Sequence, residues 1–109
     1  MNKIGDKTIL ENQKISQASD NAAEFLKTLA NPNRLIILSC LSKGESCVGD
    51  LEKNLNISQS ALSQHLSRMR GEGILARRRE SQQIFYSIDD DRVGKFLDVV
   101  CEIFCKNNN

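Results

Sequence analysis

The stretch SQSALSQHLSRMR, residues 58–70, decides the fold. Its apolar residues Leu62, Leu66 and Met69 recur at the spacing of one helix face. Ser58 stands before them as a typical N-cap residue, and two glycines follow the stretch as a C-terminal stop. The pattern therefore predicts an amphipathic helix with one apolar side.

The other side of this predicted helix is small and polar. Short serine side chains let a helix approach base edges closely, and glutamine can form two hydrogen bonds with an adenine edge. The N-terminus of a helix also attracts phosphate oxygens. A solvated polar face without a ligand is the simpler interpretation. On the DNA-binding interpretation, the contacts from this helix are Ser58, Gln59, Ser60, Ser63, Gln64, His65, Ser67 and Arg68.

His65 lies near the apolar edge of the same helix. Its default interpretation is a hydrogen-bonded histidine at the boundary of the core. A contact with a DNA phosphate is the more specific interpretation, and the sequence leaves both open.

Helical patterns also precede this stretch. CVGDLEKNL, residues 47–55, has apolar residues at helical spacing, and Ser46 can cap it. A short turn joins it to the next helix, so the two form a helix-turn-helix. Further upstream, RLIILSCLS is apolar almost all round, which predicts a buried helix that starts at Pro32 after an Asn31 cap.

The chain before Asn31 divides into two parts. Residues 19–29 carry apolar residues at helical spacing and predict the first helix. Residues 1–18 are too weakly periodic for an assignment, so we treat them as an N-terminal arm.

Two short β-type runs follow the 58–70 helix. ILARRR and IFYSI flank a polar tip at 80–83, which predicts a β-hairpin. Asp89–Asp91 then supply an acidic start for a last helix. The apolar seam of that helix consists of Val93, Leu97, Val100 and Phe104.

These elements predict a mainly α fold with a small β-hairpin, a winged helix-turn-helix. Its five helices and two strands come in the order α-α-α-α-β-β-α. We expect an arm over 1–18 and one DNA-binding and dimerisation domain over 19–107.

The positive charge of the chain is local. The formal net charge is +1, which gives no overall attraction to nucleic acids or membranes. Residues 60–86, however, carry five arginines and two acidic residues. Three consecutive arginines alternate sides of a strand, so they cannot all face DNA, and one of them can pair with an acidic residue instead. The wing contacts that we predict are Arg78, Arg79 and Gln82.

Length and composition exclude several classes of protein. A chain of 109 residues has room for one modest core. No apolar run approaches a spanning helix, and the first residues do not form a signal peptide, so we expect a cytoplasmic protein with no membrane partner. An enzyme is disfavoured because no paired acids and no glycine-rich phosphate loop are present.

The four cysteines are open to three interpretations, namely packing, metal ligation and redox chemistry. Cys101 and Cys105 share one face of the last helix on the rim of its apolar seam. Partial accessibility there favours oxidation or persulfidation of Cys105, whereas Cys101 is interpreted as a core or interface residue. Cys40 lies on the apolar helix, where packing and sensing are both open.

Over residues 20–105 the chain resembles the ArsR/SmtB family of winged-helix repressors. The resemblance rests on LANPNRLIIL, SCVGDL, SQSALSQHLSRMR and the wing strand IFYSI, in this order. It implies a homodimer paired through the first and last helices. Such a dimer binds a pseudopalindromic double-stranded operator and releases it when an inducer binds. The apolar seams of both helices agree with a partner.

The metal sites of that family are incomplete in this chain. Where the family's third helix has a CVC motif, only Cys47 remains and Gly49 replaces the second cysteine. Of the family's four zinc ligands on the last helix, only one has a counterpart, at Asp90. The resemblance therefore implies no metal site and no cofactor.

Within the family, the chain resembles the BigR/SqrR/HlyU branch, which senses reactive sulfur. Cys105 matches the branch's cysteine near the chain end, but the aligned position in the second helix is Ser39, next to Cys40. The resemblance implies that Cys40 and Cys105 are the sensing thiols and that reactive sulfur species or oxidants are the inducer. A metal-responsive repressor with cysteine thiolates, a repressor with structural cysteines and another inducer, and a module that binds no DNA stay open as alternatives.

Overall fold

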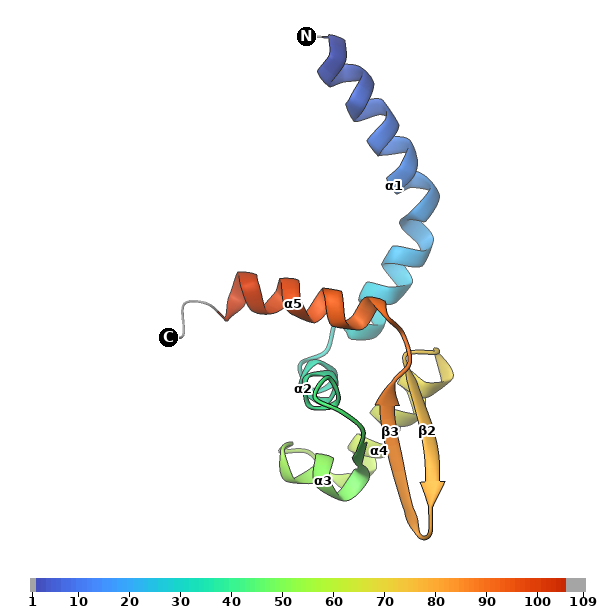
Figure 1. Cartoon of the computed structure of the whole chain (residues 1–109), viewed down its shortest axis with the longest axis vertical. Helices are drawn as coiled ribbons and strands as arrows, with labels where there is room; N and C mark the ends of the chain where they lie inside the picture. Colours follow the sequence, from blue (N-terminus) through green and yellow to red (C-terminus); the bar gives the residue numbers. More distant parts are fainter. Residues whose placement is uncertain (1, 106–109) are drawn as a thin grey trace. The chain divides into compact units, whose positions relative to one another are not determined.

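The computed structural model describes residues 2–105, and the side chains from residue 9 onward (Figure 1). Two compact units divide between residues 30 and 31. The elements are α1 (Asn2–Leu29), α2 (Pro32–Leu41), β1 (Ser46–Cys47), α3 (Val48–Lys53), α4 (Gln59–Gly71), β2 (Leu75–Glu80), β3 (Gln83–Ile88) and α5 (Arg92–Phe104). The predicted winged helix-turn-helix with a small antiparallel hairpin is confirmed.

The first unit is the long helix α1. It begins at Asn2, so residues 2–18, which the periodicity left unassigned, are helical and continuous with the helix predicted over 19–29. The apolar residues of this segment are spread around the helix, and periodicity therefore did not reveal it. No helix in the described part of the chain is long and apolar enough to cross a membrane. The exposed residues of α1 include the large apolar side chains of Ile9, Leu10, Ile15 and Leu26.

Each helix of the second unit contributes at least one buried apolar side chain to the core of that unit. Leu51 of α3 and Val93 of α5 are at most 1% exposed. The prediction that α2 is buried all round holds for one side only, because Ile36 is 44% exposed. The other buried apolar residues of this unit are Ile37, Leu38, Leu41, Leu62, Leu66, Met69, Ile74, Leu75 and Tyr86.

Two of the predicted helix caps are confirmed. The Asn31 side chain accepts hydrogen bonds from the backbone N–H groups of Asn33 and Arg34, at 2.9 and 3.2 Å. The Ser58 hydroxyl accepts one from the Ala61 N–H at 3.0 Å. Both caps satisfy backbone donors that a helix start leaves without an intrahelical partner.

The predicted Ser46 cap is wrong. Ser46 lies in β1, where it pairs with Tyr86, and Cys47 pairs with Phe85. Cys47 then takes the N-cap position of α3 without a side-chain hydrogen bond. Pairing with β3 places the backbone of this segment in a sheet, and the sequence carries no sign of such a two-residue strand.

The three strands form one antiparallel sheet in the order β1-β3-β2. The register of the wing runs from Leu75 opposite Ile88 to Glu80 opposite Gln83. A two-residue turn of Ser81 and Gln82 closes it, with Ser81 at φ 57°. Such left-handed backbone fits the twist of a tight hairpin.

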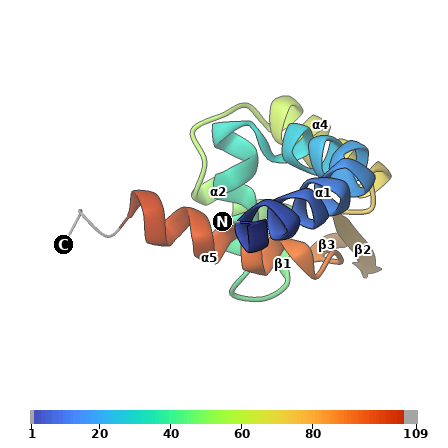
Figure 2. The ribbon, with the colours of Figure 1, turned by 90° about the horizontal axis from the view of Figure 1, so that it is seen from above.

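Helix α5 starts with the predicted acidic residues. The Asp90 carboxylate accepts a hydrogen bond from the Arg92 N–H at 2.9 Å, whereas Asp91, at the N-cap position, makes no such bond. Figures 1 and 2 show that the C-terminal half of α5 extends beyond α2. The apolar seam is buried at its start and exposed at its end, where Phe104 is 71% exposed.

Candidate nucleic-acid interface

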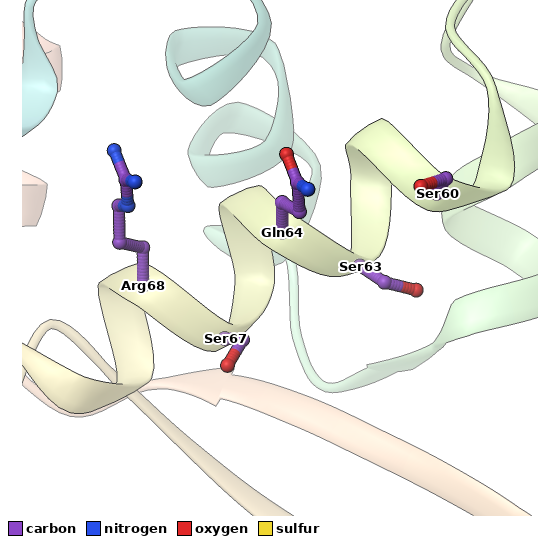
Figure 3. Close-up of a pocket in the computed structure, with 5 residues that line it drawn as sticks. All are labelled: Ser60, Ser63, Gln64, Ser67 and Arg68. Carbon is purple, nitrogen blue, oxygen red and sulfur yellow. The ribbon is translucent and has the colours of Figure 1, made fainter.

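Helix α4 has two chemically different sides, as the sequence predicted. Leu62, Leu66 and Met69 are at most 1% exposed and anchor the helix in the core. The opposite side borders an open groove of about 480 Å³. The groove is lined by Ser60, Ser63, Gln64, Ser67 and Arg68 (Figure 3).

The lining residues fall into two rows along α4. Figure 3 shows Gln64 and Arg68 projecting to one side of the helix, whereas Ser63 and Ser67 point to the other. Each row repeats after four residues, which is about one helical turn. The helix thus presents amide and guanidinium groups beside two hydroxyls, all of them able to bond base edges or phosphates.

A second hollow lies between α3, the start of α4 and the wing. It measures about 370 Å³ and brings Gln59 and Ser63 of α4 together with Gln82 of the wing turn. Three sequence-predicted residues from two segments therefore meet in one place. Glu52 and Gln83 also line this hollow, and the sequence analysis missed both, since only the packing of α3 against the wing places them here.

Arg78 is held against the body of the protein. Its guanidinium donates to both carboxylate oxygens of Glu45, at 2.7 and 2.8 Å, and lies 4.7 Å from the centre of the Phe85 ring. The hydrogen bond from Arg78 lowers the pKa of Glu45 and raises the pKa of the arginine. Of the three consecutive arginines, Arg78 is thus the one whose ion pairs with acidic residues the described structure shows, and the phosphate contact predicted for it stays a prediction.

Arg79 has a different environment on the same strand. It is exposed and pairs with Ile84 in the wing register, and successive side chains of a strand point to opposite faces. The phosphate contact of Arg79 stays a prediction.

His65 connects α4 to α2. Its Nδ1 accepts a hydrogen bond from the Nε of Arg34 at 3.2 Å, so the neutral ring carries its proton on Nε2. Burial lowers the pKa of His65, and the charges of Arg34 and Arg68 lower it further. Arg34 also lies 3.9 Å from the Glu72 carboxylate, and its side chain is 11% exposed. The boundary-histidine interpretation is confirmed, while a phosphate contact through Nε2 stays a prediction.

The two sequence-predicted sensing thiols have different surroundings. Cys40 is half-buried on α2, whereas Cys105 is exposed at the C-cap of α5. No disulfide or hydrogen bond joins them within residues 9–105. Cys101 is exposed, so the core interpretation of this residue is wrong.

No cluster of three or more histidine, cysteine or acidic residues that could hold a metal ion occurs in the described part of the chain. Cys47 lines the hollow between α3 and the wing.

Comparison with protein families gives one match over residues 31–77. This family is described as "Bacterial regulatory protein, arsR family". The matched range begins at the cap of α2 and ends inside β2, so it contains the whole helix-turn-helix.

Two related proteins match over most of this chain. The nodulation protein NolR of Rhizobium meliloti is 47% identical, over 76% of this chain and 68% of its own. The transcriptional activator HlyU of Vibrio cholerae is 38% identical, over 88% of this chain and 89% of its own. The name of HlyU and the description of the matched family both denote regulators, which agrees with the expectation that the chain is not an enzyme.

A solved structure supports the same relationship. The transcriptional repressor BigR from Xylella fastidiosa superposes with a TM-score of 0.83 and is 35% identical. The superposition covers 86% of this chain and 96% of that one.

Proposed function

Because this chain belongs to the arsR family of bacterial regulatory proteins, we propose that it is a transcriptional repressor, like BigR, and that it binds a pseudopalindromic operator as a homodimer. The observation that carries this proposal is the outward side of α4. Five polar residues line an open groove there, directly behind the three most deeply buried residues of the helix. A firmly anchored helix with a short, polar outer surface fits the major groove of DNA.

We assign direct base contacts to the middle of α4. Gln64 has the amide that bonds an adenine edge, and the small Ser60, Ser63 and Ser67 let the helix axis come close to the bases. Arg68 reaches from the next turn to a guanine edge or a phosphate. Ser58 and Gln59, at the N-terminus of the helix, lie where phosphate oxygens are attracted.

The wing supplies phosphate contacts beside the helix. Arg79 and the Gln82 side chain at the turn are exposed and reach the backbone next to the bound groove. Arg78 has a positioning role, since its pair with Glu45 connects β2 to the segment before β1.

The dimer that we propose uses the exposed apolar residues of α1 and α5. Each helix, taken by itself, exposes large apolar side chains, including Ile15 on α1 and Ile103 on α5. Such surfaces in a regulator mark contacts with another chain. Dimerisation sets the two α4 helices about one DNA turn, or ~34 Å, apart.

The inducer that we propose is a reactive sulfur species or an oxidant, which modifies a cysteine pair that includes Cys105. The exposure of Cys105 supports this assignment, because accessible thiols react and buried ones do not. Cys40, the partner predicted from sequence, is half-buried on α2. A bridge involving α5 shifts the dimer helices and with them the spacing of the two α4 helices.

The test is binding to a DNA duplex that the fully reduced protein selects from a random-sequence pool. We expect a two-fold symmetric consensus and an affinity that falls steeply with salt. Gln64→Ala is expected to weaken binding about tenfold for each half-site, the cost of one bidentate base contact per protomer. Gln17→Ala, an exposed glutamine of α1, is the matched control and leaves the affinity unchanged.

The wing is tested by the salt dependence of the same binding. Arg79→Ala removes one phosphate contact from each protomer and lowers the slope of log affinity against log salt by about 2 for the dimer. Arg78→Ala leaves that slope unchanged. A selection that returns no consensus, together with salt-independent binding, contradicts the proposed function.

A further inference from the structure

Cys101 and Cys105 form a pair of exposed thiols at the free end of α5. They are four positions apart in the chain, so both side chains lie on one side of the helix. The backbone N–H of Cys105 donates to the Cys101 carbonyl at 2.8 Å, which shows that the helical turn between them is closed. Both residues are exposed, unlike Cys40 and Cys47.

The two sulfur atoms interact with each other. A hydrogen bond to Cys105 is the largest cause of the raised pKa of Cys101, followed by the charge of Cys105, by burial and by the charge of Asp98. The thiol of Cys101 therefore holds its proton beside the sulfur of Cys105. By contrast, no disulfide or hydrogen bond joins Cys40 to Cys105 within residues 9–105.

The spacing of the pair selects the kind of bridge. Residues four apart on a helix have Cβ atoms about 5–6 Å apart. A disulfide requires a Cβ separation of about 3.5–4.5 Å. A direct disulfide therefore needs unwinding of the last turn, whereas a bridge with one inserted sulfur atom spans the gap while α5 stays helical.

We infer that Cys101 and Cys105 are the thiols that a hydrogen polysulfide bridges, with one inserted sulfur atom between them. This inference rests on the proposed function, of which it names the cysteine pair. It replaces Cys40 by Cys101 as the partner of Cys105.

The reaction consists of two exchange steps. The Cys105 thiolate attacks the central sulfur of HSSSH, one S–S bond breaks, and HS⁻ leaves to be protonated to H₂S. The Cys101 thiolate then attacks the same sulfur and expels the second HS⁻. The two protons of the thiols end on the two H₂S molecules. The thiols are oxidised and the polysulfide is reduced, so no other reactant is needed.

The position of the bridge connects it to regulation. Both cysteines lie on the rim of the apolar seam, and Cys105 directly follows the exposed Ile103 and Phe104 in the chain. An added sulfur atom there changes the shape of the α5 surface that we assign to the dimer. Asp98, whose charge acts on Cys101, borders the pair on the polar side.

The experiment treats the full-length reduced protein with polysulfide, digests it with trypsin and measures peptide masses. Cleavage after lysine and arginine places Cys101 and Cys105 together in peptide 96–106, while Cys40 lies in peptide 35–43. The wild-type protein is expected to yield peptide 96–106 with one sulfur atom gained and two hydrogens lost. A link between the two peptides would overturn the inference, and so would the absence of any bridge.

Three variants separate the candidate pairs. Cys40→Ser and the matched control Cys47→Ser are expected to keep the bridged peptide in full. Cys101→Ser is expected to lose it completely and to leave Cys105 as the hydropolysulfide Cys–S–S–SH, with two sulfur atoms gained, because no second thiol expels the outer sulfur. Because Cys101 is exposed, this variant keeps its fold, which its circular dichroism spectrum checks. Retention of a bridge in Cys101→Ser and its loss in Cys40→Ser would assign the pair to Cys40 and Cys105.

Two further measurements complete the test. Diamide, which supplies no sulfur, is expected to leave peptide 96–106 without a bridge, and a disulfide within that peptide would show that the inserted atom is not required. The affinity of each sample for the selected duplex is measured as well, because it distinguishes the identity of the cysteine pair from the regulation of DNA binding by sulfur. If the bridge forms and the affinity stays the same, the cysteine pair is correct and the regulation by sulfur is wrong.

Discussion

Helices α4 and α5 both have 13 residues, yet they use their surfaces in opposite ways. In α4 the three large apolar residues are buried and the exposed residues are small or polar. In α5 only Val93 is buried, while Val99, Ile103 and Phe104 are 52–71% exposed. Within the described chain, other residues cover the large apolar side chains of α4, whereas several of those of α5 stay exposed. A polar outer surface suits nucleic acid, and an apolar one suits a second protein chain.

The largest effect that we expect follows from a charge in the apolar surface of α5. Phe104→Asp places a carboxylate where we propose the dimer contact, and it should convert the protein to a monomer. Operator affinity should fall by about 10²-fold, because one half-site then binds without the other. Sedimentation velocity and duplex titration measure both effects. Glu102→Gln is the exposed control on the same helix, and a Phe104→Asp variant that stays dimeric would exclude this surface as the interface.

A change on α4 should have a smaller effect of a different kind. Arg68→Ala should lower the affinity for the selected duplex by about tenfold, within the 1–3 kcal/mol typical of a base contact, and leave the dimer intact. Lys95→Ala removes an exposed charge from α5 and serves as the control. If both variants lose affinity equally, the effect comes from overall charge and not from α4.

The caps of the two helices should also differ. Ser58→Ala removes the hydroxyl that accepts the Ala61 N–H and should cost about 1 kcal/mol of unfolding free energy. Asp91→Ala at the start of α5 should cost less, because the Asp91 side chain makes no cap hydrogen bond. Urea denaturation measures both values. Equal losses would mean that the geometry of the Ser58 cap does not contribute to stability.

His65, on α4, should make the free energy of unfolding depend on pH, whereas α5 contains no histidine. Its pKa in the folded protein lies below its ordinary 6.5, so the unfolded chain takes up the proton first as the pH falls. The stability due to His65 is therefore complete above pH 6.5 and is lost as the pH falls from there toward the folded pKa. Denaturation midpoints between pH 5 and 7.5 measure this slope, and His65→Gln should flatten it. An unchanged slope in the variant would assign the effect to other groups.

Much of α4 could be predicted because its determinants are local. The Ser58 cap acts within three residues, and the spacing of Leu62, Leu66 and Met69 separates the two sides of the helix. The same reasoning failed for α1, whose apolar residues do not gather on one side over 2–18. Ser46 was misassigned because a serine before a helix is also compatible with a strand, and only the pairing with Tyr86 decides between them.

The sequence by itself determined the order of the five helices and the two wing strands, the polar side of α4, the Asn31 and Ser58 caps and the shared face of Cys101 and Cys105. All of these depend on residues within one or two helical turns of each other. Tertiary structure alone decided that Arg78 pairs with Glu45 and that His65 accepts a hydrogen bond from Arg34. Those partners lie 33 and 31 residues apart in the chain. Which of several charged or polar groups meet over such a distance depends on how the helices and strands pack, and local spacing contains no information about that packing.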